Sequence, residues 1–459
     1  MPISNSCIQA NANALIGAAT TRQLAQVSGL LTENSTYSVA CIAALPSASD
    51  NQGRLIYVTD ISAYRYSDGD SWSNCYDTTC RVALRQLFGW GWDACGNLGN
   101  GICPSYAWSS EVREQCSATN WCLITNASCV TSAIKTDGTL WRWGRYVPNG
   151  SGMSASPIQE QNSSTNWCFA RQGGGGNGHA HGIKTDGTMW GWGYNDDGQL
   201  ATNLVNLYTT CTTPVQEITS STNWINTAIG SNHSAGVKSD GTFWSWGGDN
   251  SAGVLGINST AISKYSSPVQ EITSSTNWCY ASAGNAFTSG LKTDGTLWSM
   301  GIHLYGTLGT GCANSVSASS PTQEFCSATN WSKLSSSGSG TNNQSAIKTD
   351  GTLWNWGNNT YGMLAIGSGS GSVCSAKQEF CSATNWCFTD VGKKHTAAIK
   401  TDGSLWMWGE AQYGNIQRAS NACTPIQEQN LGTSWCTATA GLSSTLAIKQ
   451  IIKGFNTPS

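Results

Sequence analysis

One short stretch recurs through most of the chain: residues 133–144, which read Ala-Ile-Lys-Thr-Asp-Gly-Thr-Leu-Trp-Arg-Trp-Gly. Close copies stand at 182–193, 236–247, 290–301, 346–357 and 398–409. Asp-Gly between two β-prone runs is a strong hairpin signal, because a type I′ turn requires positive φ at both central residues. The sequence therefore predicts an array of hairpins, with turn residues that include Asp137, Gly138, Asp186, Gly187, Asp240 and Gly241.

The tryptophans in the second arm of each hairpin stand at positions i and i+2, so both rings point to one face of the strand. We expect these rings to fill the space between neighbouring sheets and to be largely buried. In the copy that ends at Gly301, Met300 replaces the second ring. The tryptophans assigned this structural role are Trp90, Trp92, Trp141, Trp143, Trp190, Trp192, Trp244, Trp246, Trp298, Trp354, Trp356, Trp406 and Trp408.

Three other segments repeat in step with the hairpin. They are a Pro-x-Gln-Glu-like run, a Thr-Asn-Trp-like run and an apolar run that ends in lysine, and each occurs seven times. Four β segments repeated seven times, with a period of about 52 residues, are typical of a β-propeller with four-stranded blades. The predicted fold class is therefore all-β, a seven-bladed propeller preceded by a short helix and a β-hairpin.

The phase of the repeat predicts how the ring closes. The first element is the tryptophan run at 86–92, and the last is the run that ends at Lys449. We expect one blade to combine three strands from the C-terminal end with one from the N-terminal end, which leaves no free sheet edge. The predicted domains are a helical anchor (1–35), a β-hairpin connector (36–80), the propeller (81–450) and a tail (451–459).

Composition excludes several classes of protein. Charged residues make up 11% of the chain and the net charge is −3, so no basic field is present to hold nucleic acid or an anionic membrane. No run of 18 apolar residues is present, so we expect no membrane insertion. No lysine or arginine precedes Arg22, and we therefore expect no secretory signal peptide.

The N-terminal region differs from the array. Residues 4–31 predict a helix with a thin apolar stripe, which we expect to dock or to oligomerise; the alternative is a frayed tail. Two strands are predicted at 54–59 and 61–66. The run Gly-Arg-Leu-Ile-Tyr-Val-Thr-Asp, followed by Tyr-Ser-Asp-Gly-Asp-Ser-Trp, resembles short β modules of bacteriophage tail fibres and other virion appendages.

The repeat itself resembles a known family. Trp-Gly-Tyr-Asn-Asp-Asp-Gly-Gln-Leu (192–200), Thr-Pro-Val-Gln-Glu (213–217) and the run from Gly230 to Gly241 are similar to the regulator-of-chromosome-condensation repeat. That resemblance implies a seven-bladed propeller and covers residues 81–450. The eukaryotic founder is a nucleotide-exchange factor that also binds nucleosomes, and this chain lacks the basic tail that nucleosome binding would need. The run Lys-Thr-Asp-Gly-Thr-Leu-Trp is very similar to the repeats of bacterial and phage members.

The chain has 19 cysteines, many of them at equivalent places in the repeat. We expect most to be buried free thiols that act as small hydrophobes. Cross-links such as Cys116–Cys122 or Cys381–Cys387 are the alternative. Zinc is not expected, because the paired Cys and His spacings of zinc sites are absent.

No residue pattern indicates catalysis. His179, His233 and His395 hold one repeat position and are expected to bond to backbone, and the repeated Glu and Lys residues are expected to pair strands or to cap amides. The glycines at 173–176 lack the Lys-Ser/Thr of a phosphate loop. A calcium loop at 194–198 is the alternative that we considered, but its full pattern is absent. We expect no enzyme activity, no cofactor and no metal.

The segments that vary between repeats lie between Trp-Gly and Pro-x-Gln-Glu, at 93–110, 145–156, 194–213, 248–267, 302–320, 358–375 and 410–424. Variable loops on a rigid scaffold often bind partners, and loops rich in Tyr, Ser and Asn suit polar or sugar-bearing targets. The alternative is that they are inter-blade connections only. The candidate binding residues are Tyr106, Trp108, Tyr194, Asp196, Asp197, Tyr208, His303, Tyr305, Tyr361 and Tyr413.

Together these patterns predict a non-enzymatic virion protein of a bacteriophage, such as a tail-fibre, spike or decoration subunit. We expect residues 1–80 to bind other virion proteins and to form a homo-oligomer, with a trimer as the first hypothesis. The propeller loops are expected to bind a host-surface glycan or protein. The alternatives are a cellular surface or filament protein with extracellular display, and a cytosolic propeller of the exchange-factor or lyase type.

Overall fold

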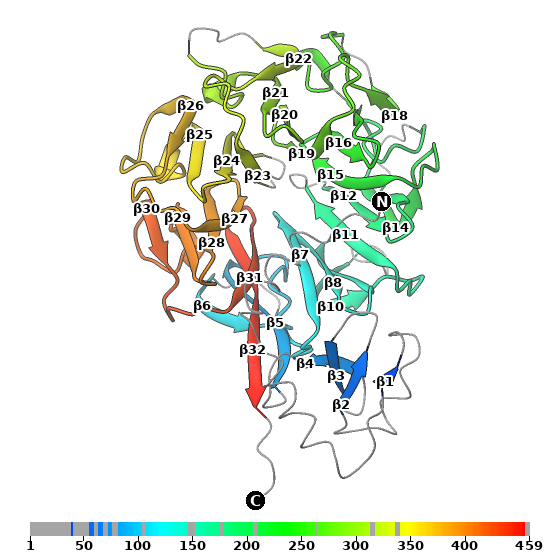
Figure 1. Cartoon of the computed structure of the whole chain (residues 1–459), viewed down its shortest axis with the longest axis vertical. Helices are drawn as coiled ribbons and strands as arrows, with labels where there is room; N and C mark the ends of the chain where they lie inside the picture. Colours follow the sequence, from blue (N-terminus) through cyan, green and yellow to red (C-terminus); the bar gives the residue numbers. More distant parts are fainter. Residues whose placement is uncertain are drawn as a thin grey trace, which may run out of the picture. The chain divides into compact units, whose positions relative to one another are not determined.

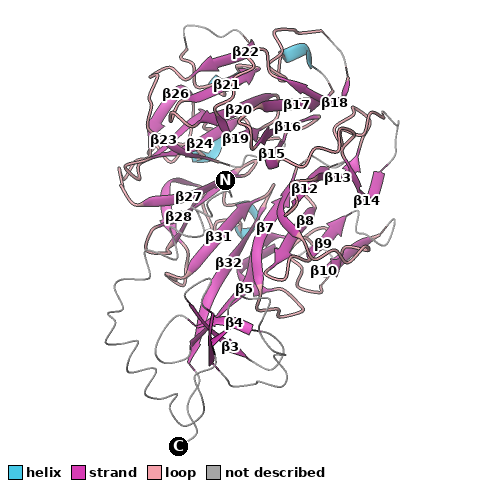
Figure 2. Ribbon diagram, turned by 45° about the vertical axis from the view of Figure 1, so that its right-hand side comes forward, coloured by secondary structure: helices cyan, strands magenta, loops and turns pink. Residues whose placement is uncertain are grey.

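The structure is a computed structural model. It describes residues 38–39, 55–58, 63–67, 72–75 and 81–454, apart from 103–106, 146–151, 174–177, 205–209, 249, 262–263, 313–316 and 336–339. Contacts divide the chain into two units, one made of residues 1–84 and 451–459 and the other of residues 85–450. Strands predominate in the described part (Figures 1 and 2), and no helix there has the length and hydropathy that a membrane crossing requires.

The smaller unit contains four short strands, β1 (Ser38–Val39), β2 (Leu55–Val58), β3 (Ala63–Ser67) and β4 (Trp72–Cys75). β2 and β3 pair antiparallel, as the predicted strands at 54–59 and 61–66 require. β4 extends this pair on the β3 side, and β1 runs parallel to β2. The predicted helix at 4–31 lies outside the described residues.

The larger unit contains a seven-bladed propeller of four-stranded antiparallel blades, as predicted. Blades 1 to 6 each take four consecutive strands: β7 (Trp121–Ala127), β8 (Val130–Lys135), β9 (Leu140–Arg145) and β10 (Met153–Gln159); β11 (Trp167–Gln172), β12 (His179–Lys184), β13 (Met189–Tyr194) and β14 (Thr210–Gln216); β15 (Trp224–Ile229), β16 (His233–Lys238), β17 (Phe243–Gly247) and β18 (Tyr265–Gln270); β19 (Trp278–Ala283), β20 (Phe287–Lys292), β21 (Leu297–Gly301) and β22 (Ala318–Gln323); β23 (Trp331–Leu334), β24 (Asn343–Lys348), β25 (Leu353–Asn358) and β26 (Ser372–Gln378); β27 (Trp386–Val391), β28 (His395–Lys400), β29 (Leu405–Gly409) and β30 (Ala422–Gln427).

The seventh, closing blade joins the two ends of the propeller. Its order is β6 (Ala107–Arg113), β5 (Arg81–Trp92), β32 (Ser444–Gly454) and β31 (Trp435–Ala440). Two strands therefore come from each end, and the predicted division into three and one is wrong. The reason is that Ala107–Arg113, although its Pro-x-Gln-Glu motif is degenerate, still pairs with β5 through Phe88 and Arg113.

The first strand of each blade lies at the centre of the ring. These strands contact one another from blade to blade, for example β7 with β11 and β31 with β7 (Figure 1). Because the strands are antiparallel, the loops that join third to fourth strands lie on one face of the ring, together with the turns between first and second strands. We call this the loop face. The Asp-Gly turns join second to third strands and lie on the opposite, Asp-Gly face.

The Asp-Gly turns are hairpins of a different type from the one predicted. In the first, the Gly138 amide donates to the Lys135 carbonyl (2.9 Å) and the Lys135 amide donates to the Thr139 carbonyl (3.0 Å). Only Gly138 has positive φ (+77°), so the loop is a three-residue turn with glycine in the left-handed position, not type I′. A Cβ at Gly138 would collide with the Thr165 carbonyl oxygen, which explains the glycine.

The two tryptophans of each run differ in burial. The second ring, which directly precedes a glycine, is 0–2% exposed in the six copies that have it: Trp90, Trp143, Trp192, Trp246, Trp356 and Trp408. The ring two residues earlier is half-buried, and so is Trp92, which lies beyond the buried Trp90. The prediction that the rings are largely buried therefore holds for the second ring only. Most of the second rings donate their indole N–H to a loop carbonyl of the preceding blade, as Trp356 does to Thr307 (3.0 Å) and Trp408 to Met363 (2.8 Å). These rings therefore tie each blade to its neighbour.

The prediction that the repeated cysteines are buried hydrophobes is also wrong. Ten cysteines of the described part lie outside the two disulfides discussed below, and all ten are exposed or half-exposed. Cys168 and Cys387 occupy a β-bulge in the first strand of their blades, and each thiol donates to the carbonyl across from it, that of Ile183 or Ile399 (3.4 Å in both). Ser332 makes the same contact to Ile347 (2.9 Å), whereas blade 3 has Ile225 at this bulge.

Candidate binding face

The repeated glutamates serve the frame of the propeller. Each carboxylate is buried and organises the loop that leads to the next blade. Glu217, for example, accepts the backbone amides of Thr219 and Ser221 (2.7 Å each) and the indole N–H of Trp224 (3.3 Å). Glu217 therefore has a structural role, because its carboxylate oxygens accept hydrogen bonds from within the loop.

The repeated lysines and aspartates form a second structural unit. Lys348 lies over two indole rings, with its Nζ 4.9 Å from the Trp331 centroid and 4.2 Å from the Trp354 centroid. Trp354 donates its indole N–H to the Thr352 hydroxyl (2.8 Å), which donates to Asp350 (2.6 Å). Cation–π contact and hydrogen bonds thus explain why Lys, Asp, Thr and Trp recur together.

The three repeat-equivalent histidines bond to side chains, not to backbone as predicted. The Nε2 atoms of His179, His233 and His395 lie 2.8–2.9 Å from a hydroxyl on the next blade, belonging to Ser234, Thr288 and Thr445 respectively. Burial lowers the pKa of His233 to about 4 and that of His395 to about 3. The imidazoles are therefore neutral hydrogen-bonding groups that join blades.

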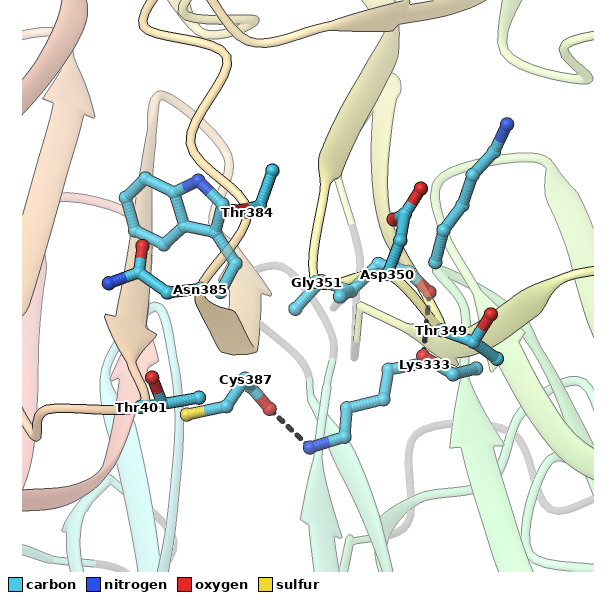
Figure 3. A pocket seen from close by; sticks show the side chains of 12 residues that line it. Lys333, Thr349, Asp350, Gly351, Thr384, Asn385, Cys387 and Thr401 are labelled. Carbon is cyan, nitrogen blue, oxygen red and sulfur yellow. Dashed lines mark hydrogen bonds between the residues drawn. The ribbon is translucent and has the colours of Figure 1, made fainter.

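No group of three or more His, Cys, Asp or Glu side chains in the described residues is arranged to hold a metal ion. A depression of about 340 Å³ lies on the Asp-Gly face between blades 5 and 6 (Figure 3). The Lys333 ammonium group points into it and donates to the Cys387 carbonyl. The nearby Asp350 carboxylate is engaged by Thr352, so this depression offers no acid–base pair.

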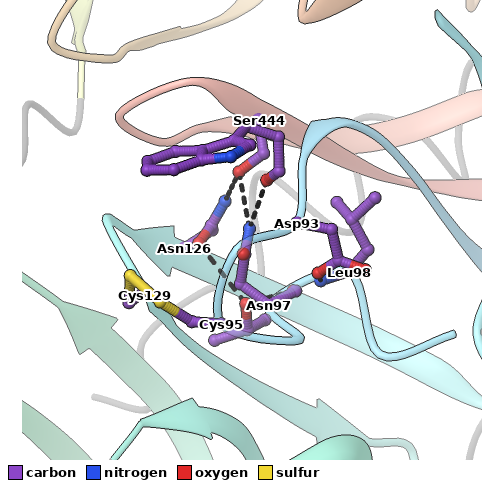
Figure 4. Close-up of a disulfide and its surroundings, with 9 residues drawn as sticks. Asp93, Cys95, Asn97, Leu98, Asn126, Cys129 and Ser444 are labelled. Atoms are coloured by element: carbon purple, nitrogen blue, oxygen red, sulfur yellow. Dashed lines mark hydrogen bonds between the residues drawn. A yellow bond between two sulfur atoms is a disulfide. The ribbon is translucent and has the colours of Figure 1, made fainter. Parts of the chain in front are cut away.

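Two disulfides join loops of adjacent blades, and neither was predicted. Cys95–Cys129 links the closing blade to blade 1, and Cys312–Cys374 links blade 4 to blade 5. Figure 4 shows the first beside Asn97 and Asn126, which both donate to the Ser444 hydroxyl (2.9 Å). The predicted alternatives Cys116–Cys122 and Cys381–Cys387 do not form, since Cys116, Cys122 and Cys381 are free thiols.

The loop face carries the candidate binding residues that the structure describes. Tyr106 and Tyr208 lie outside the described residues. Trp108, on β6, is half-buried against the core, and His303 is 8% exposed. These two side chains are therefore poorly placed to contact a partner.

The predicted group at Tyr194, Asp196 and Asp197 is engaged within the protein. The Tyr194 hydroxyl donates to Asp196. Asp197 pairs with Lys264 (2.9 Å), which also donates to the Asp196 carbonyl (2.8 Å). These contacts fasten the blade 2 loop to the blade 3 segment before β18, and they fit the alternative of an inter-blade connection.

The remaining three candidates share one repeated position. Tyr305, Tyr361 and Tyr413 occupy equivalent positions on blades 4, 5 and 6, in the short 3₁₀ segments η4 (Leu304–Gly306), η5 (Thr360–Gly362) and η6 (Gln412–Gly414). Blade 3 has η3 (Asn250–Ala252) at this place, without a tyrosine. Trp92, assigned above to the frame, stacks on Tyr413 with centroids 5.3 Å apart. We call these four residues the aromatic arc.

Comparisons with known proteins agree with this architecture. A family model described as the regulator of chromosome condensation (RCC1) repeat matches residues 186–237. The ultraviolet-B receptor UVR8 of Arabidopsis thaliana is 28% identical over 202 residues, 44% of this chain and 44% of that protein. The mitochondrial RCC1 domain-containing protein RUG3 of Arabidopsis thaliana is 24% identical over 71% of this chain and 78% of its own length. The aligned region thus spans less than half of the length of UVR8.

Solved structures show the same fold at low identity. Human WBSCR16 superposes with a TM-score of 0.66 at 15% identity, over 80% of this chain and 98% of that one. Yeast RCC1 (Prp20), solved with Kap60 bound, gives 0.67 at 14% identity, over 81% of this chain and 90% of that one. A likeness at this level of identity concerns the frame of the propeller, so it does not indicate which loop residues form the aromatic arc.

Proposed function

Because the chain carries RCC1 repeats on a seven-bladed propeller, we propose that it is a non-enzymatic recognition module that binds a macromolecular partner through its loop face. The main support is that the repeated polar side chains are engaged within the protein, whereas three tyrosine rings of the loop face are exposed. The repeated Glu, Lys, Asp and His side chains are engaged in intramolecular contacts, as Glu217, Lys348, Asp350 and His395 illustrate. The three exposed tyrosine rings of the arc remain for recognition.

The relatives supply precedents for binding by such propellers. The solved yeast complex pairs RCC1 with Kap60, and a second yeast structure is described with binding to Gsp1p and histones. Those partners belong to those proteins. For this chain the sequence points to a different setting, because charged residues are only 11% of the total and the net charge is −3, which does not suit a nucleosome.

A site-specific cross-linking experiment tests the binding face. A photoreactive amino acid is placed at Leu304, which is exposed on the loop face, or at Thr293, which is exposed beside the Asp-Gly turn of the same blade. The full chain is then irradiated with a cell-surface extract and a soluble extract. We expect adducts from position 304 and not from 293. Adducts from 293 alone, or substrate turnover by the purified chain, would contradict the proposal.

More specifically, we propose that the chain is part of a bacteriophage appendage that presents the propeller to a host surface. It rests on the likeness of residues 53–72 to tail-fibre modules, and it places the partners of residues 1–80 within the virion. Oligomerisation as a trimer belongs to the same proposal. Mass spectrometry of purified particles tests it: the chain should be present at a fixed ratio to the major capsid protein. Its absence from particles would leave the cellular-surface alternative.

A further inference from the structure

The tyrosines of the aromatic arc combine exposure with an unusual backbone. Tyr305, Tyr361 and Tyr413 are 45%, 39% and 38% exposed. Their φ angles are +59°, +69° and +68°, in the left-handed region that bulky side chains rarely adopt. Each such residue costs the folded state about 1–2 kcal/mol relative to an ordinary conformation. A strained backbone that carries an exposed ring thus occurs three times, which requires an explanation.

The fold does not require tyrosine at this place. The equivalent residues on the other blades include Cys95, Asp197 and Ala252, none of which has positive φ. Their loops nevertheless make the same following turn, in which a glycine with positive φ precedes the buried leucine at 98, 200 or 255. The tyrosines are therefore additions to a turn that forms without them. Strain of this kind is typical of functional positions.

The rings are held on a rigid base. Gly306 and Gly362 approach the outer strand of the next blade so closely that a Cβ would meet its backbone, at Cys374 and Cys423. The Cys312–Cys374 disulfide joins the loop that bears Tyr305 to blade 5. At the other end, Tyr413 stacks on Trp92 at an angle of 18° between the rings. A pre-ordered surface loses little conformational entropy when it binds.

The surroundings of the arc carry almost no charge. The loop segments 302–320 and 358–375 contain no Asp, Glu, Lys or Arg, and 410–424 contains only Glu410 and Arg418. Glu410 is neutralised by Lys394 (3.0 Å), whose Nζ lies 5.8 Å from the Tyr361 ring. Around the rings the loops are rich in Asn, Ser, Thr and Gly. The surface therefore offers aromatic faces and neutral hydrogen-bonding groups.

We propose that the aromatic arc binds a neutral polysaccharide, which would lie across blades 4, 5 and 6. This inference rests on the proposed function and names its ligand. The C–H groups on the face of a pyranose ring carry partial positive charge and pack on the negative face of a tyrosine ring. Neutral hydroxyls match the uncharged loops. A ligand with a repeating unit suits binding positions that repeat from blade to blade.

The test uses the full chain and soluble neutral polysaccharides, namely a dextran, a mannan and a galactomannan, with heparin as a charged comparison. Binding is measured by affinity electrophoresis and calorimetry at 50 and 500 mM NaCl (about 14 and 4 Å of screening length). We expect at least one neutral polysaccharide to bind with the same affinity at both salt concentrations. Tyr305→Gly and Tyr361→Gly should each weaken it by about ten-fold or more.

Glycine is chosen because it accepts the left-handed backbone, so loss of binding cannot be ascribed to misfolding. The matched control is Phe380→Gln, since Phe380 is an exposed ring outside the arc and Gln115, Gln161 and Gln429 occupy its place on other blades. This variant should bind like the parent. Binding that falls with salt, or that survives both glycine substitutions, would overturn the inference.

The cross-linking experiment separates this inference from the function on which it rests. A protein captured at position 304, with no neutral polysaccharide bound, would refute the polysaccharide as ligand while the loop-face function stood. Adducts at position 293 alone, with no polysaccharide bound, would remove both. Loss of the captured protein in the Tyr361→Gly variant would assign the aromatic arc to protein recognition instead.

Discussion

The Nε2 atom of His395 on blade 6 lies 2.8 Å from the Thr445 hydroxyl on the closing blade. Thr445 in turn donates to the Asn415 carbonyl in the blade 6 loop (2.8 Å). A hydroxyl that already donates must accept from the imidazole, so His395 carries its proton on Nε2. One neutral side chain thus fastens the C-terminal strand of the ring to the blade before it.

Acidification should weaken the fold through its buried histidines. Burial lowers the pKa of His181 and His233 to about 4 and that of His395 to about 3, and it lowers the pKa of His179 well below its usual value. Below pH 6.5 the unfolded chain binds protons that the folded chain excludes. Stability is therefore complete above about pH 7 and is lost as the pH falls towards 4, by about 2 kcal/mol for each of His181, His233 and His395 between pH 7 and 5.

Urea unfolding at pH 5, 6 and 7 measures this dependence. The matched variant is His395→Asn, because Asn343 occupies the equivalent place on blade 5. Its stability should depend less steeply on pH than that of the parent, by about 1.4 kcal/mol per pH unit. An unchanged slope would show that His395 is protonated in the folded state or solvated in it.

Replacement of Asp93 by Asn should stabilise the protein at neutral pH. Asp93 is 2% exposed, and burial raises its pKa to about 6 although it accepts the Leu98 amide (2.9 Å). Asn195 and Asn359 accept the equivalent amides on other blades, so Asn preserves the contact without a buried charge. We expect a gain of about 1–3 kcal/mol at pH 7 that disappears near pH 4. Equal stability at pH 7 would contradict the raised pKa.

The two tryptophans of one pair should differ in importance. Trp356→Ala should cost about 3–5 kcal/mol, since the ring is 1% exposed and its indole bonds to Thr307. Trp354→Ala should cost less, because that ring is half-buried beneath Lys348. Trp356→Met is the control, as Met300 fills this place on blade 4. Chemical denaturation of the three variants measures the order, and equal costs for both alanines would contradict it.

Removal of residues 443–459 should destabilise the whole ring. The deletion takes β32 from between β5 and β31 and leaves the closing blade divided. We expect a single cooperative transition at a lower melting temperature in a calorimetric scan. A truncated chain that melted like the parent would show that the ring does not depend on this closure.

Thiol chemistry should separate the two disulfides from the other cysteines. Titration of the denatured, unreduced protein should report at least the ten free thiols of the described residues. Cys95→Ser with Cys129→Ser should lower stability by about 3–4 kcal/mol, the chain-entropy value for a separation of 34 residues. The paired change Cys326→Ser with Cys381→Ser is the control and should be neutral. A loss in the control alone would reverse this assignment.

The propeller could be predicted from the sequence alone. The spacing of Lys184, Gly187 and Trp192 recurs from blade to blade, because each blade meets its neighbours in the same way, and identical contacts select identical residues. The same periodicity identified the variable loops. It could not show that β6 completes the closing blade, because pairing with β5 compensates for a degenerate motif.

The contacts of the repeated residues, and the loop residues that come together, could be seen only in the folded protein. The bond from His395 to Thr445 depends on strands that lie 50 residues apart in the sequence. The pairing of Cys95 with Cys129 likewise depends on two blades that meet only when the ring closes. Tyr194 and Tyr361 both lie in variable loops, yet Tyr194 bonds to Asp196 and Tyr361 is exposed with a left-handed backbone. The exposure of Tyr361 and the strain of its backbone depend on packing between blades, which cannot be deduced from a local sequence pattern.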